Sequence, residues 1–347
     1  MTLAACITSV SGPVLLPEER AFLRDAQPWG VILMGRSCFS HVQVRTLVND
    51  IHEALGREAL VFIDQEGGRV ARLKAPEWPR FPAPAVYGAL YHQDRRLGLE
   101  ACRLGHQLMA LELSNLGIHA DCAPVCDLRQ PTTHDAIGDR AFGYAVETVI
   151  ALATAAFEGL RAGGVVGCMK HMPGQGRATV DSHHDLPRIE TPERLLELDF
   201  SVFEALSDIA PMGMTGHVAL DAVAPGVAAT VSPEVISEVI RERIGFDGLL
   251  MTDDLGMEAL GGSLHDRGAR ALAAGCDVLL HCSGFLRDPQ EILREMREVA
   301  DAANTLTGEA LARARRVEDA VLPAQTIDTA VSWQRFEALI ANAHGGV

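Results

Sequence analysis

VVGCMKH (165–171), followed at once by MPGQGRATVDSHHDLP (172–187), is the stretch that decides the fold. A short apolar run ends in two basic side chains, Lys170 and His171, and prolines and glycines then break regular structure. Such a run is typical of a parallel strand that is buried on both faces and has a loop at its carboxyl end. The same pattern recurs along the whole chain.

Seven further runs share this pattern: AACITSV (4–10), GVILMG (30–35), ALVFIDQ (59–65), IHADCAP (118–124), PMGMTGH (211–217), GLLMTDD (248–254) and CDVLLHC (276–282). Helical stretches fit between the runs, at 40–55, 95–116, 146–162, 191–206, 233–244 and 264–274. Eight strand–helix units predict an α/β chain with a TIM-like (β/α)8 barrel. We expect a single domain over 1–347, with the barrel over about 1–285 and helices of 286–347 packed on it. A doubly wound open sheet is the alternative fold.

Composition narrows the class of protein. With 347 residues, 48% apolar and 22% charged, the chain is long enough to bury a large core. Its net charge of −16 is spread along the sequence and repels nucleic acid and anionic membrane surfaces. No apolar run approaches the ~18 residues of a membrane span. We expect a monomer that binds a small molecule, with neither nucleic acid nor membrane as a partner.

The eight cysteines form no CxxC motif, and several lie inside apolar runs where cysteine behaves as a small hydrophobe. Without an export signal, free thiols in a reducing cytoplasm are expected. Cys276, His281 and Cys282 fit no structural zinc spacing, so we expect no metal. There is also no dinucleotide fingerprint or P-loop, and no cofactor is expected.

Polar side chains gather where the predicted strands end. They are Asp64, Asp121, Lys170, His171, His217, Asp253, Asp254 and His281. In a β/α barrel this end is the active-site face. Capping of the following helices could explain two or three of the acids, but not the lysine and three histidines. The pattern therefore indicates an enzyme site.

The loop after Lys170 carries a DSH triplet, with Asp181 two residues before His183. In an extended segment such residues point the same way, so the carboxylate can reach the imidazole. This pairing fixes the tautomer and suits a group that donates a proton in one step and removes one in the next. A solvated turn is the alternative for the triplet alone, but the strand-end Lys-His pair before it favours catalysis.

Three other segments contain candidate catalytic or binding residues. In GLLMTDDLGM (248–257) two adjacent acids end a strand, and only one of them can face a substrate, but strand periodicity does not choose between them. FIDQEGGRVARL (62–73) supplies Asp64 and Arg72, and AIGDRAFG (136–143) supplies Arg140. A lone acid or arginine of this kind is more often part of a surface salt bridge.

Taken together, IDQEGGRV, APVCDL, IGDRAFG, KHMPGQG, DSH, MTGHV and MTDDLGM resemble the motifs of family 3 glycoside hydrolases. The resemblance spans about residues 30–282. Within the family, the sequence is most similar in type to the bacterial single-domain β-N-acetylglucosaminidases of peptidoglycan recycling. It implies that Asp253 is the nucleophile and His183 the acid/base, with Asp181 as its partner. It also implies a set of sugar-binding residues: Asp64, Arg72, Arg140, Lys170 and His171.

The resemblance implies retaining hydrolysis of terminal N-acetylglucosamine (GlcNAc) from GlcNAc-1,6-anhydro-N-acetylmuramic acid (anhydroMurNAc), with or without its peptide. Two alternatives stay open: a phosphorylase on the same scaffold, which uses phosphate in place of water, and a non-catalytic sugar-binding protein.

The sequence departs from the family pattern at two places. Met172 and Gln175 replace the usual residues of KHFPGHG, and Ser37 follows Arg36 where the family has Asn. Gln175 removes an ionisable group near the loop, while the proposed catalytic residues are intact. We expect the loop over 172–187 to close on binding, since Gly174 and Gly176 permit it.

Overall fold

The computed structural model describes residues 2–182 and 185–344, and it confirms the predicted closed barrel. Every pair of neighbouring barrel strands is parallel, and the last strand pairs with the first. The strands, in order around the wall, are β1 (Ala4–Ser9), β2 (Pro28–Leu33), β3 (Leu60–Ile63), β4 (Ala120–Asp121), β5 (Val166–Met172), β7 (Met212–Thr215), β9 (Leu249–Asp254) and β10 (Val278–Leu280). A separate two-stranded sheet pairs β6 (Arg188–Ile189) with β8 (Ala219–Leu220). Closure rules out the open sheet.

The predicted helices between the strands are present. They are α2 (His41–Leu55), α4 (Arg95–Ser114), α5 (Val146–Ala162), α6 (Glu193–Leu206), α7 (Leu264–Ala274) and a wider π-type helix over Val235–Arg243. Two helices, α1 (Pro17–Ala26) and α3 (Pro84–Gln93), were not predicted. Each begins with proline, which breaks a helix interior but suits the first helical position, where its missing N–H is not needed.

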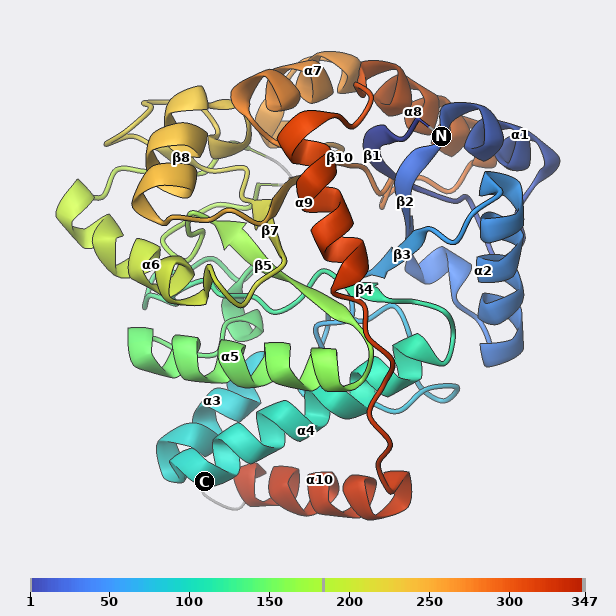
Figure 1. Cartoon of the computed structure of the whole chain (residues 1–347). Helices are drawn as coiled ribbons and strands as arrows, with labels where there is room; N and C mark the ends of the chain where they lie inside the picture. Colours follow the sequence, from blue (N-terminus) through green and yellow to red (C-terminus); the bar gives the residue numbers. More distant parts are fainter. Residues whose placement is uncertain (1, 183–184, 345–347) are drawn as a thin grey trace.

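Three helices follow the last barrel strand: α8 (Pro289–Ala302), α9 (Gly308–Asp319) and α10 (Thr329–His344). In Figure 1, α9 crosses the barrel in the foreground and α10 runs below α4. Ala314 and Val317 of α9 belong to the apolar cluster of the barrel interior, and Trp29, at the start of β2, donates to the Glu318 carboxylate at 2.8 Å. Helix α9 therefore covers the amino-terminal end of the barrel, which leaves the carboxyl ends of the strands for a site.

The barrel interior is a packed apolar core. Ile7, Trp29, Ile32, Phe62 and Leu249 are fully buried there, and the Trp29 and Phe62 rings lie 5.6 Å apart. Burying each large side chain of this kind stabilises the fold by ~1.5–3 kcal/mol. Because side chains fill the interior, a ligand can bind only at the rim.

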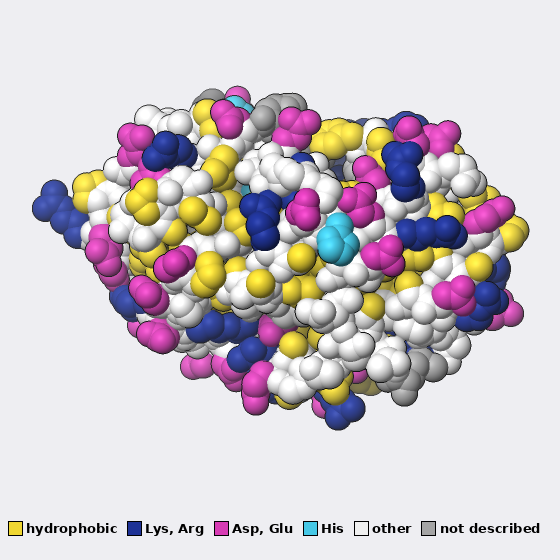
Figure 2. All heavy atoms as spheres, turned by 90° about the horizontal axis from the view of Figure 1, so that it is seen from above, with side chains coloured by type: hydrophobic (Ala, Val, Ile, Leu, Met, Phe, Trp, Pro, Cys, Tyr) yellow, Lys and Arg dark blue, Asp and Glu magenta, His cyan; other side chains and the backbone are white. Residues whose placement is uncertain are grey.

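The surface has a mixed character. Acidic and basic side chains are interspersed over the face drawn in Figure 2, in keeping with the dispersed charge of the sequence. Within residues 2–182 and 185–344, none of the helices is both long and apolar enough to cross a membrane.

Helices α4 and α5 approach closely because α5 has glycine at the contact. A Cβ on Gly159 would collide with the Arg103 carbonyl oxygen and lie 2.9 Å from the Gln107 nitrogen. We expect Gly159→Ala to lower the free energy of unfolding by ~1–3 kcal/mol, as overpacking does. The matched control is Gly12→Ala, whose Cβ meets nothing within 4 Å. Urea unfolding curves measure both, and equal stability of the two variants would contradict this account of the contact.

Candidate active site

A cavity of about 350 Å³ opens at the carboxyl ends of the barrel strands. It is lined by every predicted site residue that the structure describes: Asp64, Arg72, Arg140, Lys170, His171, Asp181 and Asp253. These residues come from distant parts of the chain, as expected for a barrel whose loops meet at one face. His183 lies outside the described residues.

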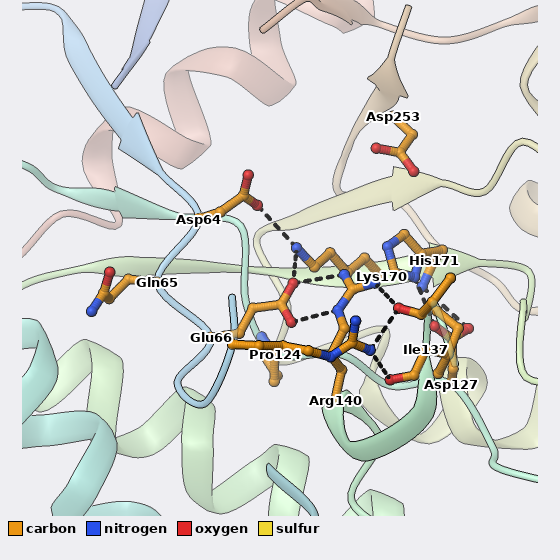
Figure 3. A network of polar contacts seen from close by, with 12 residues as sticks. Asp64, Gln65, Glu66, Pro124, Asp127, Ile137, Arg140, Lys170, His171 and Asp253 are labelled. Atoms are coloured by element: carbon orange, nitrogen blue, oxygen red, sulfur yellow. Dashed lines mark hydrogen bonds and ion pairs between the residues drawn. The ribbon is translucent and has the colours of Figure 1, made fainter. Parts of the chain in front are cut away.

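Lys170, on β5, is the centre of the polar network in Figure 3. Its ammonium lies 3.1 Å from Asp64 Oδ1 and 2.6 Å from Glu66 Oε1, and its side chain is only 3% exposed. The other oxygen of Asp64 accepts a hydrogen bond from Arg72 Nη2 at 2.9 Å. One buried cation thus joins β5 to the loop that follows β3.

Glu66 is a site residue that the sequence did not assign. Its carboxylate accepts two hydrogen bonds of 2.8 Å from Arg140, whose third nitrogen donates to the Ala136 carbonyl. A signal was present, because Glu66 follows Asp64 by two positions and can therefore share its face. The pair of bonds holds the loop of Arg140 against the loop after β3.

The charged groups in the cluster of Lys170, Asp64, Glu66, Arg72 and Arg140 keep one another ionised by shifting their pKa values. Burial alone would raise the pKa of Asp64, but Lys170 and Arg72 hold it well below its usual value. Burial acts on Glu66 in the same direction, but Arg140 and Lys170 lower its pKa to about 2. The two carboxylates in turn raise the pKa of Lys170 against the effect of burial. At neutral pH, three cations therefore face two carboxylates.

His171 is fixed by Asp127, another site residue that the sequence pattern did not single out. Its Nδ1 lies 2.7 Å from Asp127 Oδ2, and both side chains are buried. Asp127 Oδ1 accepts from the Gln175 backbone nitrogen at 2.6 Å. The imidazole is thereby oriented, which leaves Nε2 as the ring nitrogen that can meet a ligand.

The two adjacent acids of β9 have different surroundings. Asp254 Oδ1 lies 2.9 Å from His281 Nδ1 and accepts from the Gly256 and Cys282 nitrogens, both at 3.0 Å. Among the described residues, the Asp253 carboxylate accepts one hydrogen bond, from the Asp254 nitrogen at 2.8 Å. Figure 3 shows Asp253 across from the Lys170 network with no contact drawn to it. Asp254 is thus bonded to the framework although it also lines the cavity, and Asp253 is the acid with fewer partners among the described residues.

Two further strand-end residues, Asp121 and His217, form hydrogen bonds within the protein and do not face the cavity. Asp121 accepts from the Gln65 nitrogen at 2.9 Å, and burial raises its pKa. His217 lies 2.7 Å from Thr230 Oγ1 and 3.0 Å from the Asp254 carbonyl, and burial lowers its pKa. Neither residue lines the cavity.

The loop after β5 is anchored over its first half. Besides the bond to Asp127, Gln175 donates to Ser182 Oγ at 3.4 Å, and the His134 nitrogen donates to the Ala178 carbonyl. Gly176 packs directly against the Leu128 backbone, so glycine serves close packing there. These contacts hold Gln175, Gly176 and Ala178, and Ser182, which lines the cavity together with Asp181, is bonded to Gln175. Closure of the loop stays a prediction.

A closed parallel barrel with charged side chains gathered in a cavity at the carboxyl ends of its strands is the arrangement typical of barrel enzymes. Residues 13–320 match the Glycosyl hydrolase family 3 N terminal domain. A beta-hexosaminidase from Alkalilimnicola ehrlichii is 37% identical over 308 residues, 87% of this chain and 86% of that protein. One from Bordetella pertussis is 33% identical over 302 residues, 86% of this chain and 85% of that protein. The chain belongs to glycosyl hydrolase family 3 and is a glycoside hydrolase of the β-hexosaminidase type.

Solved structures agree with this assignment. NagZ from Neisseria gonorrhoeae, in complex with N-trifluoroacetyl-D-glucosamine, is 28% identical with a TM-score of 0.84, and the match covers 99% of this chain and 98% of that one. A Beta-N-acetylhexosaminidase from Beutenbergia cavernae is 26% identical with a TM-score of 0.73, and the match covers 98% and 96%. The family resemblance predicted from the motifs is confirmed.

His281 provides a test of the ionic framework. Burial alone would lower its pKa, but Asp254 at 2.9 Å and Glu295 at 3.0 Å raise it from 6.5 to about 9. A raised pKa in the folded state stabilises the protein fully below the unfolded value near 6.5, and this contribution is lost as the pH rises through about 9.

We expect the stability of the unmodified protein to fall more steeply across this pH window than the stability of His281→Gln. The measurement is the free energy of unfolding in urea at a series of pH values. His265→Gln, at the exposed start of α7, is the control. Parallel profiles for the unmodified protein and His281→Gln would show that the ion pair does not contribute.

Proposed function

We propose that the chain is a retaining exo-β-N-acetylglucosaminidase that removes terminal GlcNAc from muropeptides of the GlcNAc-1,6-anhydroMurNAc type, with or without peptide. One observation carries the proposal: the Asp253 carboxylate faces a preorganised cluster of cations and carboxylates across a single cavity. The volume of about 350 Å³ lies in the range of small-molecule sites. The family assignment and the hexosaminidase relatives support the type of bond that is cut.

Asp253 acts as the nucleophile in this proposal. Its carboxylate attacks the anomeric carbon while the glycosidic bond breaks and the leaving oxygen takes a proton from His183. Water then attacks the glycosyl-Asp253 ester, gives a proton to His183, and releases the sugar with its configuration retained. Asp64, Glu66 and Asp254 are less suited to this role, because each is already bound to a cationic side chain.

The Lys170 cluster binds the sugar in this proposal. Asp64 offers acceptor oxygens, and Arg72, Arg140, Lys170 and His171 offer donors, a combination that suits hydroxyl and amide groups. Because the cluster is already internally bonded, it holds its geometry before substrate arrives. Substrate binding therefore costs little reorganisation.

His183 is proposed as the acid/base, with Asp181 as the group that orients it. Asp181 and Ser182, the two residues that precede His183 in the sequence, line the cavity and support this assignment. A histidine in this role differs from the second carboxylate of most glycosidases.

We also propose that the chain acts as a single-domain monomer in the cytoplasm. All eight cysteines are buried free thiols, a state that suits a reducing compartment.

The nucleophile can be tested with Asp253→Asn. We expect kcat on p-nitrophenyl N-acetylglucosaminide to fall by roughly 10³-fold or more, since the covalent step is lost, while GlcNAc still binds in calorimetry. Asp208→Asn, an exposed acid at the other end of the barrel, is the matched control. A kcat for Asp253→Asn close to that of the control would rule out its role.

The same assay separates water from phosphate as the acceptor. Proton NMR of the product should show free β-GlcNAc first, at a rate that added phosphate does not change. Accumulation of a sugar 1-phosphate would establish the phosphorylase instead.

The acid/base can be tested through the leaving group. We expect His183→Ala to lose most of its activity on poor leaving groups and to retain far more on activated aryl glycosides, which depart without a proton. The measurement is kcat/KM across a series of aryl N-acetylglucosaminides. Equal losses across the series would refute the assignment.

A further inference from the structure

The loop after β5 has two parts that differ in burial. Residues 173–178, the inner segment, are buried apart from the half-buried Arg177. Residues 179–182, the outer segment, begin exposed and end at the wall of the active-site cavity. His183, the proposed acid/base, comes next in the sequence. Because each residue extends the chain by at most ~3.6 Å, the point where the outer segment begins limits where it can reach.

Arg177 connects the inner segment to α6. Its Nε donates to Asp199 Oδ2 at 2.6 Å, and its Nη2 donates to the Leu195 carbonyl at 3.0 Å. The two side chains of the ion pair are 14% and 3% exposed. A short charged hydrogen bond that is shielded from water in this way is stronger than an ion pair on the open surface.

Asp199 is a rigid partner for the loop. It lies on the buried face of α6, which also carries Phe200 and Phe203. The loop backbone packs against it, because a Cβ on Gly174 would lie 3.0 Å from Asp199 Cβ, and the φ of +132° at this position favours glycine. The Asp199 side chain therefore contacts the inner segment at Gly174 and at Arg177.

Stability alone does not explain an acid at this position. The other carboxylate oxygen, Asp199 Oδ1, is buried and has no partner among the described residues. Burial raises the pKa of Asp199 to about 6, and the nearby charge of Asp127 contributes to the rise, although Arg177 opposes it. A buried carboxylate that is only partly bonded costs free energy. Its contact with Arg177 is what the acid supplies in return.

The opposite side of the inner segment is held by the chain that follows β4. There the His134 nitrogen donates to the Ala178 carbonyl at 2.9 Å, and Asp127 Oδ1 accepts from the Gln175 nitrogen at 2.6 Å. Arg177 adds the contact to α6. Contacts on two sides thus define one position for the start of the outer segment.

We propose that Arg177 and Asp199 are positioning residues that hold the outer segment at the cavity and thereby set the rate of proton transfer to the leaving group. The inference rests on the proposed function, which it deepens by assigning this control to an ion pair outside the cavity. Neither residue lines the cavity, so neither contacts the sugar. A displacement of about 1 Å in a group that takes part in the reaction can cost up to 100-fold in rate.

The test compares two substrates: phenyl N-acetylglucosaminide, whose leaving group needs a proton, and the 2,4-dinitrophenyl compound, whose leaving group does not. In Arg177→Met, kcat/KM should fall by about 10-fold to 100-fold on the phenyl substrate and stay nearly unchanged on the other. The inhibition constant of GlcNAc should not change, because the sugar-binding residues are intact. Arg177→Lys should recover part of the lost rate. Arg335→Met, which removes an exposed ion pair with Glu100, is the matched control and should keep both values.

The partner is tested with Asp199→Asn. If the two side chains act as one unit, the double variant Arg177→Met, Asp199→Asn should lose no more than the larger of the two single losses on the phenyl substrate. Losses that multiply would show that the residues act separately and would overturn the proposal. Asp199→Asn also provides the comparison if Arg177→Met does not fold, which thermal unfolding of each variant reveals.

The pH dependence gives a second measurement. Arg177 from the loop and Asp127 from the chain after β4 are the charged groups that face Asp199. Because the pKa of Asp199 is raised from 3.8 to about 6, the ion pair is complete above about pH 6 and weakens as the pH falls through that value.

Asparagine resembles the protonated acid. The ratio of the phenyl to the dinitrophenyl kcat/KM should therefore be similar in the unmodified protein and in Asp199→Asn below about pH 6, and higher in the unmodified protein above it. The ratio removes the titration of Asp253, which both substrates require. Equal ratios for the two proteins at every pH would overturn the role of Asp199.

The outcomes separate this inference from the function on which it rests. If the unmodified protein hydrolyses neither aryl glycoside, the proposed function itself fails. If it hydrolyses both and Arg177→Met loses the same factor on each, the positioning role alone is overturned, because a general loosening of the site slows both reactions.

Discussion

The structure of the site depends on one buried ammonium group. Lys170 lies between Asp64 and Glu66 with a side chain only 3% exposed, and each carboxylate is bound in turn by an arginine. Removing one partner of a buried ion pair costs ~3–5 kcal/mol, because the remaining charge is left without compensation. Apolar residues could fill the same space, so the cluster is better explained by the site that it builds than by stability. It fixes the loops after β3 and β4 against β5 in one geometry before any ligand arrives.

This pairing also separates the roles of the acids. Asp64 and Glu66 belong to the cation cluster, Asp127 holds His171, and Asp254 joins β9 to the loop after β10 through His281. Asp253 differs because its carboxylate accepts only a neighbouring backbone N–H among the described residues. Asp253 and Asp254 are adjacent in the chain but differ in their hydrogen-bond partners, and this difference separates their roles.

The sequence predicts those parts of the fold and the site that depend on local patterns of residues. Strands buried on both faces leave short apolar runs, and a polar residue at the end of each run marks one face of the barrel, so the fold and the strand-end residues Asp64, Lys170, His171 and Asp253 of the cavity could be predicted. Glu66 could have been found from its spacing to Asp64, but its partner Arg140 is distant in the chain. Asp127 was missed because no spacing rule connects it to His171. The choice between the two acids of β9 likewise required His281, which comes from the next strand.

The charges of the site differ from the charge of the chain as a whole. The chain carries a net charge of −16, yet the Lys170 cluster holds three cations against two carboxylates. Arg36, Lys74 and Arg287 line an adjoining cavity of about 280 Å³, and no acidic side chain lines it. In a concave, partly dry site such an excess attracts anions more strongly than it would on an open surface. The cations that hold the loops of the site therefore also make this part of the barrel more positive than the chain as a whole.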